Sequence, residues 1–455
     1  MPDAPLRIRR MILEGLFGSN SPRIDIPLHL DERVTVLHGR NGSGKTITLQ
    51  LLQALRAGRY DALLRYPLTR VSLETTDGAA LEIERDPSIS PSTRRGAKVP
   101  SGLRYTIRSA DGETRAGEIA ISPLKLRPSP GLRHLLTSAD LTPQGEDTWF
   151  DPRRGRLLTT AEAAAIYGFP HDDRPRSEEP ADLVELRARL PPIKLIRTDR
   201  LYVRAEEWEP GDDPRRRHPS DGSPRLMVEH LSDRIRALVQ QADREYRLTS
   251  TRLDASLPQR LFDRQASSPS PDELNARGED IQGDEARLRD LGLLRDPPTT
   301  TVDQATLSEA DRRTLSIILR DREEKLAPFK PVADKAERLL TSLRGKLHPK
   351  RVLLDVETGY RVLTAEGAPL ELGQLSSGEQ HEMVLLHELL FDVTPGSLIL
   401  IDEPELSLHV TWQQDLLPEL MEIARLASLD FVLATHSGYI IGDHEELMVR
   451  LGEPT

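Results

Sequence analysis

The stretch GRNGSGKT limits more strongly than any other feature what this chain can fold into. It fits the pattern G-x-x-x-x-G-K-T, follows the apolar run VTVL, and precedes the segment ITLQLLQAL, which is expected to be helical. A strand, a glycine-rich turn and a helix in this order place backbone N–H groups and a helix N-terminus around a phosphate. The pattern therefore predicts nucleotide binding by Gly39, Arg40, Asn41, Gly42, Ser43, Gly44, Lys45 and Thr46.

Two residues of this loop have predicted roles of their own. Lys45 is expected to reach the β- and γ-phosphates, and the Thr46 hydroxyl is expected to bind Mg²⁺. The alternative is a chance match, which average composition allows roughly one or two times in a hundred in a chain of this length. The strand and helix on either side argue against it.

Amino-acid composition excludes several classes of protein. The chain has 455 residues, 62 lysines and arginines, 73 acidic residues and a formal charge of −11. So acidic a chain is not expected to be coated in nucleic acid, although a local basic groove stays open. It has no cysteine, which excludes disulfides, Cys-ligated zinc and thiol catalysis.

The sequence also predicts the cellular location of the protein. The N-terminus MPDAPLRIRRMILEG lacks the apolar core of a signal peptide, and no stretch approaches the roughly 20 apolar residues of a membrane span. We expect a soluble cytoplasmic protein that has no contact with membranes.

The chain divides into four predicted regions. Residues 1–110 contain strands, the phosphate loop and a hairpin around Asp77-Gly78. Residues 111–222 form a loop-rich insert with a core strand near 192–203. The DPRRRH cluster in this insert could contact phosphate or could be ordinary solvated loop charge.

Residues 223–347 are predicted to form a helical hairpin or bundle for packing or assembly, and residues 348–455 form the fourth region. Leu274, Ile281 and Leu288 repeat every seven residues, and Pro328 divides a later amphipathic stretch into at least two helices. Helices of this kind would extend on the order of 30 Å. A first helix is indicated by apolar residues on one face, namely Val228, Leu231, Ile235, Leu238, Val239, Ala242 and Tyr246.

Three further motifs lie in the fourth region. QLSSGEQHEMVLLHELLF is a small-residue turn that opens an amphipathic helix, SLILIDEPELSLH is a buried strand ending in Asp402 and Glu403, and FVLATHSGYI is a buried strand ending at His436. Each alone could be a helix cap, a loop or a buried histidine. Their combination and order behind a phosphate loop are difficult to explain by packing.

Together the motifs resemble those of the ABC-type ATPase superfamily, in the branch that contains the SMC, RecF-like and OLD ATPases. GRNGSGKT resembles Walker A, LSSGEQ the signature, LILIDEPE Walker B, ELSLH the D-loop and ATHS the switch-histidine loop. The resemblance implies an α/β fold: an ABC-ATPase head, with a mixed sheet and flanking helices, interrupted by the helical insertion.

The resemblance also implies roles for residues. Thr46 and Asp402 would hold Mg²⁺, Glu403 would orient or deprotonate the attacking water, and His436 would contact the γ-phosphate of ATP. The signature residues would close on the ATP of another subunit, so the active unit would be a head-to-tail dimer or a larger ring. The glutamine that usually senses the γ-phosphate has no clear counterpart here. The implied signature residues are Ser376, Ser377, Gly378 and Glu379.

Three functions are consistent with these motifs. The chain resembles the stand-alone ATPases of bacterial anti-phage systems, most closely the AriA-like ATPase of PARIS systems. That implies slow ATP turnover, a separate effector such as a Toprim-type nuclease, and a phage-encoded trigger. A RecF-like DNA repair or clamp ATPase is the alternative, and whether DNA is bound is left open. An ABC transporter ATPase fits less well, because of the large insertion and Asn41.

Overall fold

The computed structural model divides the chain into two compact units. The first contains Met1–Ser223 and Asp392–Thr455, and the second contains Pro224–Phe391. The residues that the structure describes are 6–18, 21–85, 101–121, 136–137, 141–144, 148–152, 156–159, 179–197, 201, 226–262, 269–294, 308–406, 408 and 410–452.

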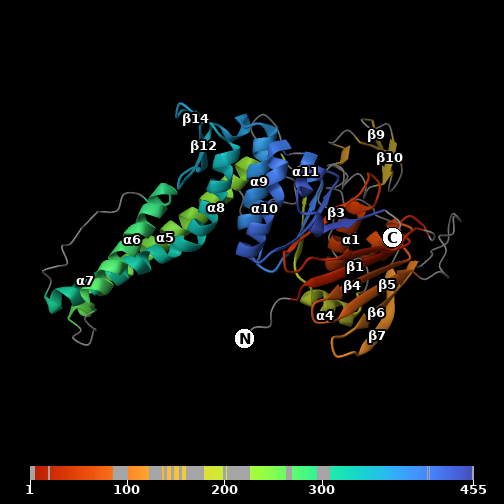
Figure 1. Cartoon of the computed structure of the whole chain (residues 1–455), viewed down its shortest axis with the longest axis horizontal. Coiled ribbons are helices and arrows are strands. Elements are labelled where there is room, and N and C mark those ends of the chain that lie inside the picture. Colours follow the sequence, from red (N-terminus) through yellow and green to blue (C-terminus); the bar gives the residue numbers. More distant parts are fainter. Residues whose placement is uncertain are drawn as a thin grey trace. The chain divides into compact units, whose positions relative to one another are not determined.

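A parallel sheet forms the centre of the first unit (Figure 1). All four pairings are parallel, in the order β11-β15-β16-β3-β17. The middle strands are almost continuously apolar and buried, as expected where both faces of a sheet are covered. The strands are β3 (Val34–His38), β11 (Ile193–Arg197), β15 (Leu398–Asp402), β16 (Asp430–Thr435) and β17 (Met448–Arg450).

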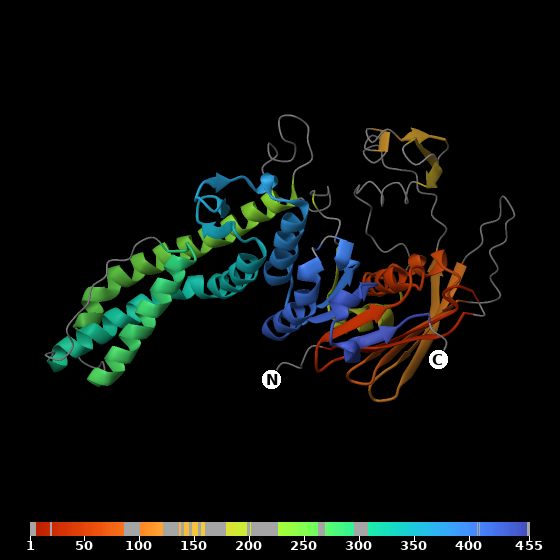
Figure 2. The ribbon, with the colours of Figure 1, turned by 45° about the horizontal axis from the view of Figure 1, so that its top comes forward.

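An antiparallel sheet of six strands forms the rest of this unit's core, and its strands lie side by side in Figure 2. The hairpin predicted around Asp77-Gly78 is confirmed, because β4 and β5 pair directly and Gly78 has a φ of 88°. In sheet order the strands are β2 (Ile24–Pro27), β1 (Ile8–Glu14), β4 (Arg70–Thr75), β5 (Ala80–Arg85), β6 (Ser101–Arg108) and β7 (Thr114–Ile121).

The loop-rich insert contributes one strand to the parallel sheet. The predicted core strand is present as β11, beside β15, with Arg197 opposite Asp402 in the register. It follows helix α4 (Ala181–Arg189). Strands β8 (Thr142–Pro143), β9 (Thr148–Asp151) and β10 (Arg156–Thr159) form a small separate sheet. The DPRRRH cluster lies outside the described residues.

Long helices dominate the second unit, in which α7 packs against both α5 and α6 (Figure 1). The first of them, α5, has 35 residues and is about 52 Å long at 1.5 Å per residue, longer than predicted. The predicted break at Pro328 is confirmed by a short 3₁₀ turn between α7 and α8. The helices are α5 (Met227–Leu261), α6 (Pro271–Asp290), α7 (Glu309–Leu326) and α8 (Lys330–Lys346).

Residues 348–391 group with these helices, although the sequence division placed them with residues 392–455. Close backbone contacts explain the grouping. A Cβ atom at Gly359 would lie 2.1 Å from the Ser232 carbonyl oxygen of α5, and Tyr360 N–H donates to Ser232 Oγ at 2.8 Å. The elements are β12 (Arg351–Asp355), β13 (Gly359–Leu363), β14 (Pro369–Leu370) and α9 (Ser377–Phe391).

No helix in the described part of the chain is both long enough and apolar enough to cross a membrane.

Candidate nucleotide site

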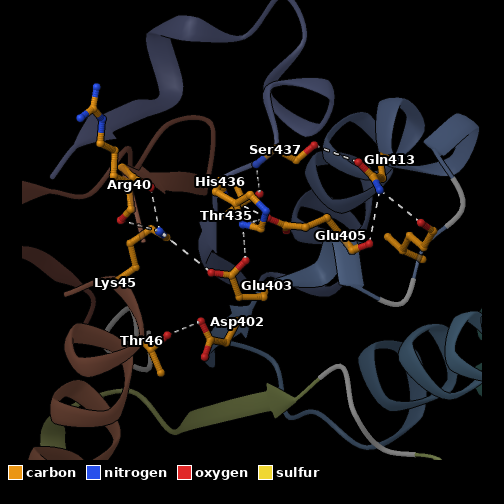
Figure 3. Close-up of polar contacts among 12 residues, drawn as sticks. Arg40, Lys45, Thr46, Asp402, Glu403, Glu405, Gln413, Thr435, His436 and Ser437 are labelled. Atoms are coloured by element: carbon orange, nitrogen blue, oxygen red, sulfur yellow. Dashed lines mark hydrogen bonds and ion pairs between the residues drawn. The ribbon is translucent and has the colours of Figure 1, made fainter. Parts of the chain in front are cut away.

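The register of the parallel sheet brings the predicted site residues of the first unit together. Asp402 pairs with Ala434, and Thr435 pairs with His38, so β15, β16 and β3 end at the same edge. The residues that follow these strand ends therefore meet, as ligand-binding residues do at the carboxyl ends of parallel strands. Figure 3 shows how the side chains after these strands point toward one another, namely Lys45, Thr46, Asp402, Glu403 and His436.

The phosphate loop leads from β3 into α1 (Lys45–Arg56), and glycine is required in it. Gly44 has a φ of 96°, and a Cβ atom there would lie 2.6 Å from Leu16 Cδ2. Gly42 also has a positive φ, of 84°. No described side chain caps the N-terminus of α1. The first N–H groups of the helix are therefore available to an anion.

The side chain of Lys45, the first residue of α1, reaches back to the backbone carbonyls of this loop. Its Nζ donates to the Gly39 carbonyl at 2.8 Å and to the Arg40 carbonyl at 3.4 Å, and it lies 4.0 Å from Glu403 Oε1. Its side chain is only 4% exposed. The loop thus holds a buried positive charge directly beside the end of β15.

Thr46 and Asp402 have the donor atoms that Mg²⁺ prefers. Thr46 Oγ1 donates to Asp402 Oδ1 at 3.0 Å. Adjacent oxygen ligands of octahedral Mg²⁺, with metal–oxygen distances near 2.1 Å, are separated by about 3 Å. The hydroxyl and the carboxylate therefore fit two neighbouring positions around a magnesium ion, which would supply positive charge to phosphate oxygens when bound.

Glu403 follows β15 in an unusual backbone conformation. Its φ is 49°, and its N–H donates to the Ala434 carbonyl at 2.8 Å. The left-handed region costs a non-glycine residue roughly 1–2 kcal/mol. Such strain tends to persist where a side chain must be aimed, and here the carboxylate lies between Lys45 and His436 (Figure 3).

His436 contacts two carboxylates. Its Nδ1 lies 2.6 Å from Glu403 Oε2 and 2.8 Å from Glu405 Oε1. Burial raises the pKa of the Glu403 carboxyl, and the hydrogen bond with Glu405 raises it further, against a lowering by His436. A carboxylate with a raised pKa is a stronger base toward water.

Sequence analysis missed Glu405 as a site residue. Its Oε1 accepts the backbone N–H of His436 at 2.8 Å, and its side chain is 6% exposed against 46% for His436. Glu405 therefore fixes the histidine from the buried side. The contact joins residues 31 positions apart, so only the fold reveals it.

Gln413, in α10 (Val410–Ala427), extends this support and was also missed. Its amide Nε2 donates to the Glu405 carbonyl at 3.3 Å and to the Leu408 carbonyl at 3.2 Å. Its Oε1 accepts from Ser437 Oγ at 2.8 Å. One buried amide thus connects the loop after β15 to the loop after β16.

A cavity of about 810 Å³ adjoins the phosphate loop. A cavity of this volume is large enough for a nucleotide-sized ligand. The half-exposed ring of Phe17 lines it and would lie 3.2 Å from a Cβ atom at Gly44. Loop residues from His38 to Ser43 line one part, and residues from Gly438 to Gly452 line another.

The predicted signature residues lie in the second unit, where they form the turn that begins α9. We call Ser376, Ser377, Gly378 and Glu379 the signature turn. The Ser376 hydroxyl and the Glu379 carboxylate form a reciprocal cap, with Ser376 N–H donating to Glu379 Oε2 at 2.8 Å. The turn is therefore rigidly organised within its own unit.

A phosphate loop after β3, a histidine after the neighbouring strand β16 and two carboxylates at the end of β15, the next strand in the sheet, define the nucleotide-binding domain of an ABC-type ATPase. The chain belongs to the family described as "AAA domain, putative AbiEii toxin, Type IV TA system", whose model matches residues 34–442.

Solved SMC heads are similar to this chain. The head from Pyrococcus furiosus, bound to the C-terminal domain of ScpA, has a TM-score of 0.32 at 14% identity, with 96% of this chain and 92% of that chain covered. The head from Thermotoga maritima has a TM-score of 0.30 at 10% identity, covering 96% and 91%. These similarities are too distant to transfer function or partners.

Replacing Glu405 should slow hydrolysis without weakening nucleotide binding. We expect Glu405→Ala to lower kcat by about 10- to 100-fold, because His436 loses the group that holds its backbone and ring. The Kd for ATP should stay unchanged in equilibrium binding, and Asp415→Asn, at an exposed carboxylate of α10, should leave kcat at the wild-type value. A wild-type kcat in Glu405→Ala would show that Glu405 has no role in hydrolysis.

Proposed function

We propose that this protein binds and hydrolyses ATP with Mg²⁺, at sites completed by a second copy of the chain. The observation that carries the proposal is the arrangement around Glu403. Its carboxylate lies 2.6 Å from His436 Nδ1 and 4.0 Å from Lys45 Nζ, beside the Thr46–Asp402 pair. Phosphoryl transfer to water depends mainly on such placement of charge and of a water-orienting group.

Each residue has a defined task in this proposal. The loop N–H groups and Lys45 bind the phosphates, and Thr46 and Asp402 hold the magnesium ion. Glu403 orients the attacking water and accepts its proton. His436 contacts the γ-phosphate and, with Glu405 behind it, keeps Glu403 in place.

We infer a second copy because the phosphate-binding groups described around Glu403, namely the loop N–H groups and Lys45, all come from one loop. The signature turn is a second N-terminal helix turn of small residues, suited to an anion. In the proposed assembly, the signature turn of one chain closes over the ATP bound to the loop of another. Head-to-tail dimers, or rings built from such contacts, follow from this geometry.

Glu403→Gln should abolish hydrolysis while leaving ATP bound. Loss of a general base typically costs 10²–10⁴-fold, so we expect turnover to fall by at least about 100-fold, with an unchanged Kd for ATP and a longer-lived assembly. Lys45→Ala is the matched variant, which should lose ATP binding itself. Phosphate-release assays and equilibrium binding separate the two, and near-normal turnover in Glu403→Gln would contradict the proposed role.

The ATPase would serve as an oligomeric scaffold and sensor in bacterial anti-phage defence, holding a separate effector until a phage-encoded trigger appears. Two observations favour this role: the family description refers to a toxin–antitoxin system, and the motifs resemble those of stand-alone defence ATPases. A Toprim-type or other nuclease is the effector class that the resemblance suggests. A cytoplasmic location follows from such a role.

A RecF-like DNA repair ATPase is the second candidate, and the motif resemblance extends to it. It requires a basic surface for DNA, whereas the chain carries a formal charge of −11. The two candidates differ in what the closed assembly retains: a protein effector or DNA.

Co-purification distinguishes the two candidates. Tagged Glu403→Gln, expressed in the native host, should retain the effector, because the closed assembly persists. Lys45→Ala should retain less of it. Mass spectrometry identifies the bound protein, and nuclease treatment before elution reveals contacts through DNA. Recovery of DNA-dependent partners alone would favour the repair function.

A further inference from the structure

The signature turn contains a negative charge at a place where the proposed function requires a second anion. Glu379 is three residues from Ser376, and its Oε2 accepts from Ser376 N–H and from Ser376 Oγ, both at 2.8 Å. A serine hydroxyl has one hydrogen to donate. That hydrogen is therefore directed to Glu379, and a bare carboxylate so placed would repel an incoming phosphate.

Lys350 neutralises this carboxylate. Its Nζ lies 2.8 Å from Glu379 Oε1 and 2.7 Å from Oε2, so it contacts both oxygens. Burial raises the pKa of the Glu379 carboxyl, but the hydrogen bonds from Lys350 and Ser376 outweigh it and hold the pKa below its usual value. The Glu379 carboxyl therefore stays ionised at neutral pH, and the lysine beside it offsets its charge.

A second lysine fixes the first in place. Lys346, the last residue of α8, pairs with Glu382 one turn further along α9, and the Glu382 side chain is fully buried. Breaking a buried pair of this kind is strongly unfavourable. Two ion pairs therefore join the end of α8 and the turn that follows it to the first part of α9.

We propose that Lys350 is a positioning residue of the ATP site, which cancels the charge of Glu379 so that the signature turn can accept the γ-phosphate of ATP bound to a second copy. When that phosphate arrives, the Ser376 hydroxyl can turn to it, because Lys350 continues to compensate Glu379. The inference rests on the proposed function, since it requires a composite site.

The same contacts connect the signature turn to the helical insertion. Lys350 follows α8 after a short turn, and α9 packs against both α5 and α8. A displacement at the end of α8 therefore moves the charge that compensates Glu379. A partner that binds the long helices could in this way favour or oppose closure of the ATP site.

A double-mutant cycle tests the inference in the Glu403→Gln background. We expect Lys350→Gln to weaken ATP-dependent association, measured by sedimentation, on the order of tenfold, because Glu379 is left uncompensated. Lys350→Arg should retain most of the association. Adding Glu379→Gln to Lys350→Gln should recover much of the loss, since a neutral amide needs no counter-charge.

Matched controls make the outcome decisive. Lys330→Gln removes an ion pair at the first residue of α8, to Asp284 of α6 at 3.1 Å, and should leave association unchanged. Unchanged association in Lys350→Gln, or the same loss with and without Glu379→Gln, would overturn the inference but not the proposed function.

If Glu403→Gln binds no ATP, or does not associate in its presence, the proposed function fails. The inference is then overturned with it, because it requires a composite ATP site.

Discussion

The pairing of β15 with β16, and of β16 with β3, is the constraint on which the rest of the site depends. Because the three strands are parallel and in register, they end at one edge of the sheet. Their last residues are Asp402, Thr435 and His38. Residues far apart in the chain then meet without any further adjustment of the backbone. The left-handed conformation of Glu403 is costly, and the hydrogen bond from its N–H to Ala434 helps to hold it.

Charge is arranged around Glu403 in a consistent way. Lys45 approaches its carboxylate from the loop side, while Glu405 and His436 contact it from the opposite side (Figure 3). The cation favours the ionised carboxylate, and burial and Glu405 strengthen it as a base. The second unit repeats the same solution at the signature turn, where Lys350 balances Glu379. In both places, a carboxylate near the proposed phosphate position has a lysine beside it.

The sequence predicted those parts of the site that lie within short motifs. The loop from Gly39 to Thr46, the pair after β15 and His436 could be found because fixed spacing and flanking apolar runs identify them. Glu405 and Lys350 could not be assigned, because their partners lie 31 and 29 residues away and meet them only through packing. The length of α5 was underestimated because its second half, from Tyr246 onward, lacks a continuous apolar face.

If one ATP site uses two chains, complementation between defective chains should restore activity. Lys45→Ala lacks the loop function and Ser377→Arg blocks the signature turn, so each variant alone should be inactive. Co-expressed with different tags and purified through both, mixed assemblies contain sites in which both parts are intact. We predict that phosphate release reappears in these assemblies. Activity that stays at the level of the single variants would contradict a site shared between chains.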